Sequence, residues 1–406
     1  MQILIVDDEF HIRKLISSIL LGWGYEVFEA ENTHDAFEII EKTGINFLIT
    51  DWMMGETTGL ELCKQIRNSN LEKYVYIILL TSKTDKNELV EGMESGADDF
   101  IGKPFNVEEL KVKIKAGERI LNLESELKEK NKKLEKAYET ISNDLKYASK
   151  LQKSILPSYF KVISKDSNQK STLLINNIDF DWIYLPSAFV SGDIFNLFRL
   201  DEYHIGVYHI DVSGHGIPAS MMSVILSRML LPFQSNFLKS SLSEEPFYNI
   251  ISPAKLLENL NNYFCKERDS SLQYFTIVYM IIDIRDGKTV FSSGGHTSPM
   301  IIKSTGEIKI IDATGFPVGL IEDVEYEEQT FILEKGDRII SYSDGIIECA
   351  NHNDEQFSEE RLTDTLKKLH KLSLKDFIIE FKQDLVNWRG NTNFEDDLSL
   401  LALDIF

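Results

Sequence analysis

Apolar and polar positions follow three different patterns along the chain, and each pattern predicts a different kind of structure. Over the first 118 residues, short apolar runs alternate with amphipathic segments. The runs predict five strands: QILIVDD, YEVFEA, NFLIT, VYIILLT and DDFIGKP. The segments between them predict helices near 10–21, 34–42, 58–68, 85–95 and from 106 onward. This alternation predicts a doubly wound α/β domain, with five parallel strands covered by helices on both faces.

A heptad pattern follows. Apolar residues occupy every seventh position: Ile120, Leu127, Leu134, Ile141, Ala148 and Ile155. The second seam consists of Leu123, Lys130, Ala137, Asp144 and Leu151, and two of these positions, Lys130 and Asp144, are charged. A 3.5-residue repeat keeps one stripe facing a partner helix, so we expect 119–157 to be a coiled-coil helix that makes the chain a homodimer. A long amphipathic helix packed on its own domain would give the same pattern, but the flanking segments each look like complete domains.

Strand-like runs dominate residues 158–406, and the apolar helical patterns stand apart from them, near 217–231, 253–266, 358–370 and 374–388. Strands in series with separately grouped helices predict an α+β sandwich, in which helices flank a pair of mainly antiparallel sheets (α-β-β-α). Residues 164–176 and 234–252 are expected to be a loop and a loop or insert. The predicted domains are therefore 1–118, 119–157 and 158–406.

Composition narrows the function classes. The 406 residues carry a net charge of −22, which disfavours nucleic-acid binding because that binding draws on Lys and Arg. The acidity also fits clustered carboxylates that hold divalent cations. Three widely spaced cysteines indicate neither a disulfide framework nor a thiolate zinc site. We find no signal sequence and no apolar stretch long enough to span a bilayer, so we expect a cytoplasmic protein without membrane contact.

Polar residues gather at the ends of the predicted strands of 1–118. Asp7 and Asp8 close the first strand, Asp51 the third and Thr81 the fourth, and Lys103 follows the fifth. Ligands of a parallel sheet bind beyond these carboxyl ends. Three converging carboxylates repel one another unless a hard cation such as Mg²⁺ lies between them. A carboxylate beside that cation can accept a phosphoryl group, whose oxygens Thr81 and Lys103 would bind.

In the last domain, Asp residues recur in four turns: Ser191-Gly192-Asp193, Asp211-Val212-Ser213-Gly214-His215-Gly216, Ser343-Asp344-Gly345 and Glu395-Asp396-Asp397. One Asp-Gly pair is a weak signal because turns are rich in both, but four together are strong. Oxygen-only ligand sets suit Mg²⁺ or Mn²⁺. Two such cations about 3.5–4 Å apart can deprotonate a shared water, which then attacks phosphorus in line. We see no GxSxG elbow and no candidate catalytic Cys.

The first domain resembles response-regulator receiver domains over essentially its whole length, through DD at 7–8, ITDWMM around Asp51, Thr81-Ser82 and DDFIGKP. The resemblance implies that a histidine kinase partner phosphorylates Asp51. It implies that Asp8, Asp51 and the Met53 carbonyl hold Mg²⁺, with Asp7 assisting. Phe100 occupies the family's aromatic switch position, although the sequence is equally consistent with Phe100 as an ordinary core residue. Gly55 stands where the family often has Pro.

Residues 176–406 resemble the protein phosphatase 2C-like, SpoIIE-like serine/threonine phosphatases. The motifs that carry this resemblance are DVSGHGIPASMMS, SSGGHTSPMI, TGFPVGLI, YSDGIIECAN, FSEERL and EDDLSLLAL. The resemblance implies two or more Mn²⁺ or Mg²⁺ ions, bridged by Asp193 and Asp211 and bound by the Val212 carbonyl. Asp344 and Asp396 would complete the set, with Asp397 as the rival to Asp396. Ser191 departs from the family, which more often has Gly there.

Together these features predict a response regulator with a phosphatase output, acting on a phosphorylated protein. The family implies an anti-sigma-factor antagonist in a partner-switching pathway. His215 and His296 stay open between proton donation and simple backbone bonding in Gly-rich turns. Two alternatives remain: a catalytically silent binding module whose docking the receiver controls, and a structural dimeric adaptor. A transcription factor is disfavoured for want of a basic recognition helix.

Overall fold

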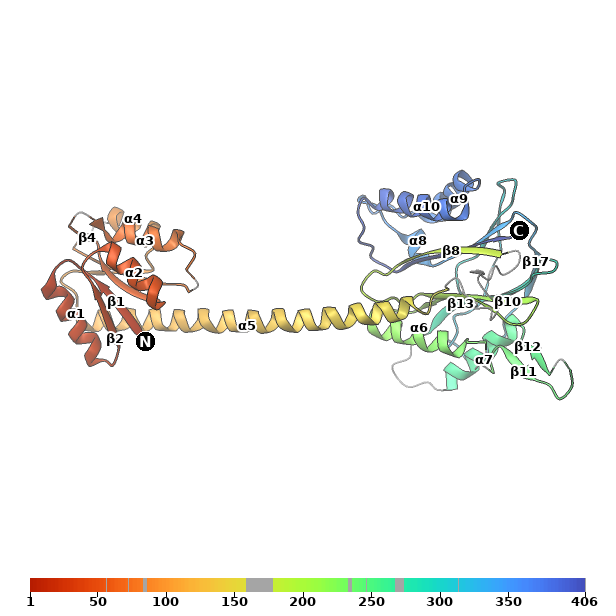
Figure 1. The fold of residues 1–406 in the computed structure, drawn as a ribbon, viewed down its shortest axis with the longest axis horizontal. Coiled ribbons are helices and arrows are strands. Elements are labelled where there is room, and N and C mark those ends of the chain that lie inside the picture. The colour runs from red at the N-terminus through yellow and green to blue at the C-terminus, as the bar shows by residue number, and fades with distance from the viewer. Residues whose placement is uncertain are drawn as a thin grey trace, which may run out of the picture. The chain divides into compact units, whose positions relative to one another are not determined.

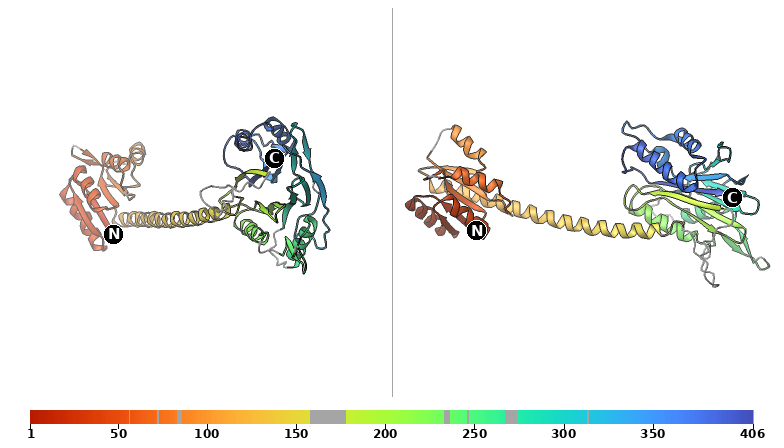
Figure 2. Two further views of the ribbon diagram at one scale, coloured as in Figure 1. Left: turned by 45° about the vertical axis from the view of Figure 1, so that its right-hand side comes forward. Right: turned by 45° about the horizontal axis from the view of Figure 1, so that its top comes forward.

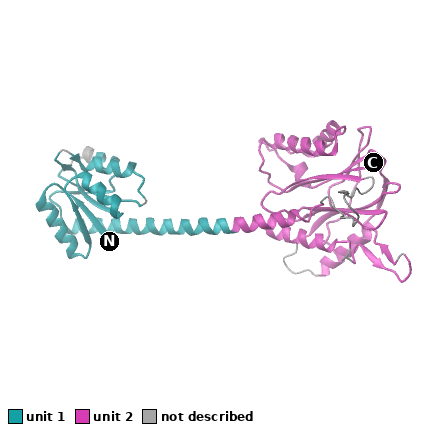
Figure 3. Ribbon diagram, viewed as in Figure 1, with its two compact units in different colours: residues 1–140 teal, residues 141–406 magenta. Residues whose placement is uncertain are grey.

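The chain forms two compact units, residues 1–140 and 141–406 (Figure 3). The computed structural model describes residues 1–406 except 56, 72, 83–85, 158–177, 233–235, 246, 267–273, 313 and 406. The loop predicted at 164–176 lies outside the described residues. Among the described residues, no helix combines the length and the apolar character needed to cross a membrane.

Unit 1 is built on one parallel sheet with the strand order β2-β1-β3-β6-β7 (Figure 1). The strands are β1 (Gln2–Val6), β2 (Glu26–Ala30), β3 (Phe47–Asp51), β6 (Tyr76–Thr81) and β7 (Asp99–Gly102). The short strands β4 (Met53–Met54) and β5 (Thr57–Thr58) pair with each other after β3. The helices between the strands are α1 (Phe10–Gly22), α2 (Thr33–Thr43), α3 (Gly59–Asn68) and α4 (Lys86–Glu94). The predicted five-stranded parallel sheet is confirmed.

Both faces of this sheet are buried, which explains why its strands are almost continuously apolar. Alternate residues of β1 enter different cores, because successive side chains of a strand point to opposite faces. Ile3 and Ile5 pack in one core with residues of α1, and Leu4 and Val6 in the other with residues of α2 and α3. Helix ends follow local signals: α3 begins with a Thr58–Glu61 capping box.

The helix α5 (Val107–Lys153) continues without a break from unit 1 into unit 2. Its first turns complete the core of unit 1, where Leu110 and Ile114 are buried. Its heptad residues Leu127, Leu134 and Ile141 are exposed within the single chain. The helix starts before residue 119 and ends before residue 157, and the three-part domain division stays a prediction.

Unit 2 consists of two five-stranded sheets whose neighbouring strands are antiparallel, in the orders β17-β14-β13-β10-β9 and β16-β15-β18-β19-β8. The first sheet contains β9 (Ile194–Arg199), β10 (His204–Val212), β13 (Phe275–Asp283), β14 (Lys288–Gly294) and β17 (Gln329–Ile332). The second contains β8 (Ile178–Leu185), β15 (Met300–Ile302), β16 (Ile308–Ile310), β18 (Arg338–Tyr342) and β19 (Leu398–Ile405).

Helices cover the outer faces of both sheets, as Figures 1 and 2 show. The first sheet carries α6 (Ile217–Met229) and α7 (Pro253–Lys266); the second carries α8 (Asp344–Glu348), α9 (Ser358–Leu369) and α10 (Leu374–Arg389). One core holds α6 and α7 residues, the first sheet, and inward residues of the second sheet such as Ile339 and Leu401. The other core lies between the second sheet and α9 and α10. The predicted sandwich is confirmed.

Two short elements differ from the sequence prediction. The stretch 234–252, expected to be a loop or insert, contains the paired strands β11 (Lys239–Ser241) and β12 (Tyr248–Ile250). Helix α8, five residues long, starts at Asp344. Neither has the length or the apolar period that a sequence pattern needs, so neither was visible from the sequence.

Candidate metal centres

The carboxylates predicted in unit 1 come together. One ligand oxygen from each of Asp7, Asp8 and Asp51 lies within 4.8 Å of the others. They meet because β1 and β3 are neighbours in a parallel sheet and end on the same side. The Lys103 ammonium lies among them, 3.0 Å from Asp7 Oδ2 and 2.8 Å from Asp51 Oδ1. This unit therefore supplies one fixed positive charge to its own acidic cluster.

The electrostatics of this cluster are partly balanced. Burial raises the pKa of Asp51, and the hydrogen bond and charge of Lys103 limit that rise. Burial alone would lower the pKa of Lys103, but the hydrogen bonds and charges of Asp51 and Asp7 together raise it. Lys103 and Asp51 therefore each favour the charged form of the other. The three carboxylates outnumber the one ammonium, which leaves room for a divalent cation.

The other predicted residues of unit 1 lie as follows. Thr81 is buried at the end of β6, and its carbonyl accepts a 2.7 Å hydrogen bond from Lys103 N. Phe100 is partly buried against the core, with the Lys113 ammonium 5.2 Å from its ring centre. The Met53 side chain is exposed, and in the sequence Met53 follows closely after Asp51. Gly59 is required sterically, because a Cβ there would lie 2.1 Å from the Asp51 carbonyl oxygen.

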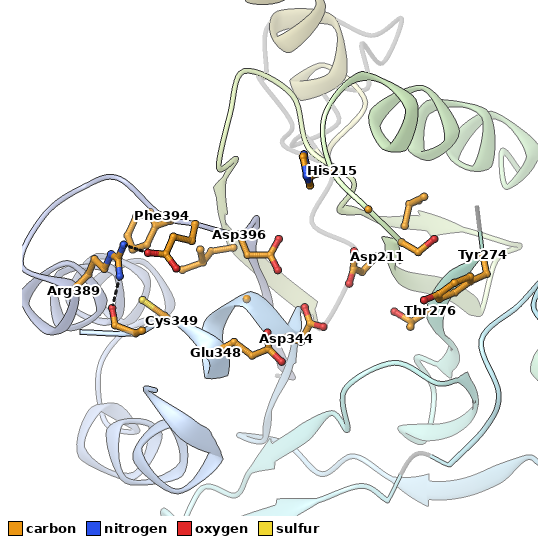
Figure 4. A pocket seen from close by; sticks show the side chains of 17 residues that line it. Asp211, His215, Tyr274, Thr276, Asp344, Glu348, Cys349, Arg389, Phe394 and Asp396 are labelled. Atoms are coloured by element: carbon orange, nitrogen blue, oxygen red, sulfur yellow. Dashed lines mark hydrogen bonds and ion pairs between the residues drawn. The ribbon is translucent and has the colours of Figure 1, made fainter. Parts of the chain in front are cut away.

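Unit 2 contains an acidic pocket of about 620 Å³ at the ends of β10 and β19. Asp211, Asp344 and Asp396 line it from three separate elements and point toward one another across it (Figure 4). Of the described residues that line the pocket, Arg389 is the only Lys or Arg. Its guanidinium lies at the edge, where it donates to Glu395 Oε1 at 2.6 Å and to the Ala350 carbonyl at 2.8 Å.

Asp193 lies behind this pocket rather than in its lining. It is 1% exposed, and Ser399 Oγ donates a hydrogen bond to its Oδ2. Burial and the charge of Asp211 raise the pKa of Asp193 well above its usual range. Burial, followed by the charges of Asp344 and Asp396, raises the pKa of Asp211 to about 7. These carboxylates therefore repel one another, and of the described residues that line the pocket only Arg389, which is paired with Glu395, is a Lys or Arg. An all-oxygen set of this kind fits hard divalent cations.

These carboxylates are more widely spread than those of unit 1. Among the described residues, the only group of three acidic, His or Cys ligands with atoms all within 4.8 Å is the one at Asp7, Asp8 and Asp51. Asp211 nevertheless interacts with Asp193, Asp344 and Asp396. It is therefore the shared member of the set in unit 2.

The adjacent Asp396 and Asp397 have different surroundings. Asp396 is exposed and lines the pocket. Asp397 is buried, and both of its oxygens are engaged: Oδ1 accepts from Ser187 N at 2.7 Å, and Oδ2 accepts from Gly192 N at 2.8 Å. Asp397 thus anchors the loop that leads to Asp193. Asp396 Oδ1 accepts from Asp397 N at 2.7 Å, and its exposed carboxylate faces the pocket.

Close backbone packing joins the loops that carry Asp344 and Asp396. A Cβ at Gly345 would lie 2.2 Å from the Asp397 carbonyl oxygen, so the loop 395–397 can approach α8 only because residue 345 is glycine. The end of α10 holds the segment after α8: Trp388 Nε1 donates to the Cys349 carbonyl at 3.0 Å. Arg389 and Trp388 were not singled out from the sequence, which shows only an amphipathic helix there.

The end of α5 reaches the loop before Asp193. The Gln152 side chain is 2% exposed and pairs with the Ser191 backbone, donating to its carbonyl at 2.6 Å and accepting from its N–H at 3.0 Å. It also donates to Ser223 Oγ on α6 at 2.9 Å. One side chain of the long helix therefore touches both the Asp193 loop and the helix that follows Asp211.

The two histidines left open by the sequence have different positions. His215 is exposed and lines the pocket. His296 is buried outside the lining, and its Nδ1 shares a 2.9 Å hydrogen bond with Thr276 Oγ1. Burial lowers the pKa of His296 to about 3, so it is neutral and not poised to donate a proton to the pocket. Cys349 lines the pocket, but burial raises its thiol pKa, which disfavours a thiolate nucleophile.

Residues 201–406 match the family model of Stage II sporulation protein E (SpoIIE). The chain belongs to this family. Residues 3–115 match the response regulator receiver domain, so a receiver domain precedes the SpoIIE-family domain in one chain. Both resemblances predicted from the sequence are thereby confirmed.

Three similar proteins illustrate the two parts. The receiver domain is 42% identical over 114 residues to the phosphate regulon transcriptional regulatory protein PhoB of Pseudomonas aeruginosa (28% of this chain, 50% of PhoB). It is 38% identical over 115 residues to the transcriptional regulatory protein SrrA of Staphylococcus aureus (28% of this chain, 46% of SrrA). The chain thus spans about half the length of these curated relatives.

The SpoIIE-family domain has the fold of the SiaA-PP2C domain of Pseudomonas aeruginosa. That structure matches with a TM-score of 0.53 and 18% identity, and the alignment covers 66% of this chain and 99% of that one. At this level of identity the comparison establishes the fold alone. The chemistry of the pocket has to be argued from this chain's own residues.

Proposed function

We propose that this protein is a two-component response regulator whose output is a metal-dependent phosphoserine/phosphothreonine phosphatase. The observation that carries the proposal is the pocket of the SpoIIE-family domain, where Asp211, Asp344 and Asp396 face one another with no unengaged Lys or Arg among the described lining residues. Membership of the SpoIIE family supports this reading of the pocket. The uncompensated charge explains why divalent cations would be needed.

Four carboxylates would hold two or more Mn²⁺ or Mg²⁺ ions: Asp193, Asp211, Asp344 and Asp396, together with the Val212 carbonyl. Bound there, the cations would activate a water for attack on phosphorus and neutralise charge on the phosphoryl group. Asp211 would be shared between the ions, because it interacts with each of the other three carboxylates. Asp397 keeps the loop before Asp193 in place through Gly192 N. Asp397 therefore supports the site without binding metal.

The receiver would control this output. Asp51 would be the residue phosphorylated by a histidine kinase, with Mg²⁺ held by Asp8, Asp51 and the Met53 carbonyl, and with Asp7 assisting. Lys103 already bonds Asp51 and would turn to the new phosphoryl oxygens, as would Thr81. Phe100 would report the change as the aromatic switch. The observation that supports this part is the compact three-carboxylate cluster beside Lys103.

The route between the two sites would be α5. Its first turns lie in the receiver core, and Gln152 near its end bonds the Asp193 loop and α6. Residues 119–157 would join two copies of the chain, because Leu127, Leu134 and Ile141 expose an apolar stripe along α5. Leu127→Asp with Leu134→Asp is expected to give a monomer by light scattering and to abolish regulation. A variant that keeps both would refute the coiled-coil route.

We propose a phosphorylated protein as the substrate, and specifically an anti-sigma-factor antagonist of a partner-switching pathway. The support for this step is family membership. A cytoplasmic location would follow from these partners.

The proposed function is tested by turnover of a generic phosphate ester with Mn²⁺, with and without beryllofluoride as the mimic of phosphorylated Asp51. Asp211→Asn is the control. Turnover that is lost in Asp211→Asn and altered by beryllofluoride supports both the enzyme and its control. No turnover in wild type with bound Mn²⁺ would favour a catalytically silent binding module instead.

A further inference from the structure

A buried histidine connects the two sheets of the SpoIIE-family domain directly behind the pocket. His209 lies on β10 and is fully buried. Its Nδ1 is 3.0 Å from Ser341 Oγ on β18, and its Nε2 is 2.7 Å from Ser399 Oγ on β19. Both serines belong to the opposite sheet, so the imidazole ring spans the interface between the sheets.

The direction of these hydrogen bonds follows from the donors available. Cation binding requires Asp193 in its ionised form, and a carboxylate can only accept, so in that form the single hydroxyl proton of Ser399 is donated to Asp193 Oδ2. Ser399 Oγ must then accept from His209, and Nε2 carries the proton that is donated. In the neutral ring, Nδ1 accepts from the Ser341 hydroxyl. The four groups therefore form one directed chain that ends on Asp193.

This chain determines what Asp193 can do. The hydrogen bond from Ser399 holds Oδ2 from the interior and restricts rotation of the carboxylate, which fixes the direction in which Asp193 would face a cation. Ser399 alone would not fix this geometry, because its hydroxyl could rotate toward another acceptor. The hydrogen bond that Ser399 Oγ accepts from His209 Nε2 limits this rotation. Hydrogen bonds of this kind behind a metal ligand orient the ligand, and their loss typically lowers metal affinity or activity about 10- to 100-fold.

We propose that His209 is a positioning residue, which acts through Ser399 to orient Asp193 for divalent cation binding. This proposal rests on the proposed function. His209 does not line the pocket, so it would contact neither the substrate nor the cations. Its effect is therefore on the occupancy of the metal site rather than on the chemical step at saturating metal.

The test measures Mn²⁺ affinity of the full chain by titration calorimetry, together with turnover as a function of Mn²⁺ concentration. Ser399→Ala and His209→Leu are each expected to weaken Mn²⁺ binding about 10- to 100-fold. The double variant is expected to be no weaker than either single variant, because both changes break the same chain. At saturating Mn²⁺, kcat is expected to fall much less than the affinity.

Two matched substitutions separate the roles of the ring nitrogens. Gln places an amide N–H near the position of Nε2, so His209→Gln is expected to restore much of the affinity lost in His209→Leu. Asn is shorter and can replace only the Nδ1 side, so His209→Asn is expected to resemble His209→Leu. Ser341→Ala, on the far side of the ring, is expected to have a smaller effect than Ser399→Ala.

Circular dichroism and thermal unfolding establish that each variant is folded. If His209→Leu does not fold, Ser399→Ala and His209→Gln still decide the matter, since the first removes only a hydroxyl and the second keeps a donor. Unchanged Mn²⁺ affinity in folded Ser399→Ala, or additive losses in the double variant, would overturn the inference. Failure of wild type to bind Mn²⁺ or to hydrolyse phosphate ester would instead refute the proposed function.

Discussion

The two acidic clusters of this chain solve the same electrostatic problem differently. In the receiver, three carboxylates lie within 4.8 Å of one another and Lys103 bonds two of them. In the SpoIIE-family domain, the carboxylates are spread around a larger pocket, and its only Lys or Arg among the described lining residues is turned to Glu395 and Ala350. The receiver cluster, which contains Lys103, would need one further cation, whereas the carboxylates of the pocket would depend more on bound ions for their charge balance.

This difference has a structural origin. The receiver carboxylates sit at the ends of neighbouring parallel strands, so one sheet gathers them. The pocket of the SpoIIE-family domain is assembled from both sheets and from α8. Its geometry therefore depends on how the two sheets are held together, by bonds such as Asp397 to Gly192 and His209 to Ser399.

The largest expected effect separates the two clusters by their consequences for catalysis. Asp211→Asn is expected to reduce Mn²⁺-dependent turnover by more than about 100-fold, beyond the range for residues behind a ligand. Asp51→Asn is expected to keep that turnover and lose only the response to beryllofluoride. Steady-state kinetics of both variants provide the measurement. Equal losses in both would contradict the separation of output from control.

Removal of metal should distinguish the clusters by stability. A ligand present at 100 times its Kd stabilises a folded state by about 2.7 kcal/mol. Chelation is therefore expected to lower the thermal midpoint of the SpoIIE-family domain more than that of the receiver, because Lys103 remains in the receiver cluster. Calorimetry with EDTA, and then with excess Mn²⁺, measures both transitions. A larger shift in the receiver would reverse the comparison.

Substitutions of the adjacent residues Asp396 and Asp397 are expected to separate metal binding from stability. Asp397→Ala leaves the buried N–H of Gly192 and the partly buried N–H of Ser187 without their acceptor. Losing the acceptor of a buried N–H costs about 1–3 kcal/mol. Asp396→Ala is expected to weaken Mn²⁺ binding with little change in unfolding free energy. Urea unfolding of the metal-free proteins and Mn²⁺ titration give the two readouts. The opposite pattern would make Asp397 the ligand.

The last expected change concerns communication between the two clusters. Gln152→Leu removes the side-chain contacts with Ser191 and Ser223 but leaves both clusters intact. The ratio of turnover with beryllofluoride to turnover without it is expected to approach one. Allosteric coupling in other proteins typically changes affinity about 5- to 150-fold, so the loss should be measurable. Gln152→Glu serves as a control, because it keeps an acceptor for Ser191 N. A ratio equal to that of wild type would exclude Gln152 from the route.

The sequence predicted the receiver site more fully than the pocket, for a physical reason. Asp7, Asp51 and Lys103 follow apolar runs, and the strand-end rule of parallel sheets brings such residues together without further information. Asp396 and Asp397 are neighbours in a loop, and no periodicity separates the one that faces a cavity from the one that is buried. Their roles become distinct only through Ser187 and Gly192, about 200 positions away in the chain.

The support behind the pocket was also invisible in the sequence. In the sequence, His209 and Ser399 are single polar residues within two separate apolar strand segments. Their contact depends on the stacking of two sheets. Only the presence of small hydroxyl residues at buried strand positions, Ser341 and Ser399, hints that a polar partner lies between the sheets.

The position of Gln152 has a practical consequence for dissecting this chain. A fragment that began at residue 158, where the sequence places the start of the last domain, would lack Gln152 and would leave the Ser191 backbone without that partner. It would also lose Leu156, which is buried in the core of the SpoIIE-family domain. An autonomous fragment of the SpoIIE-family domain should therefore start at or before residue 141, so that it keeps the last turns of α5, which pack on that domain.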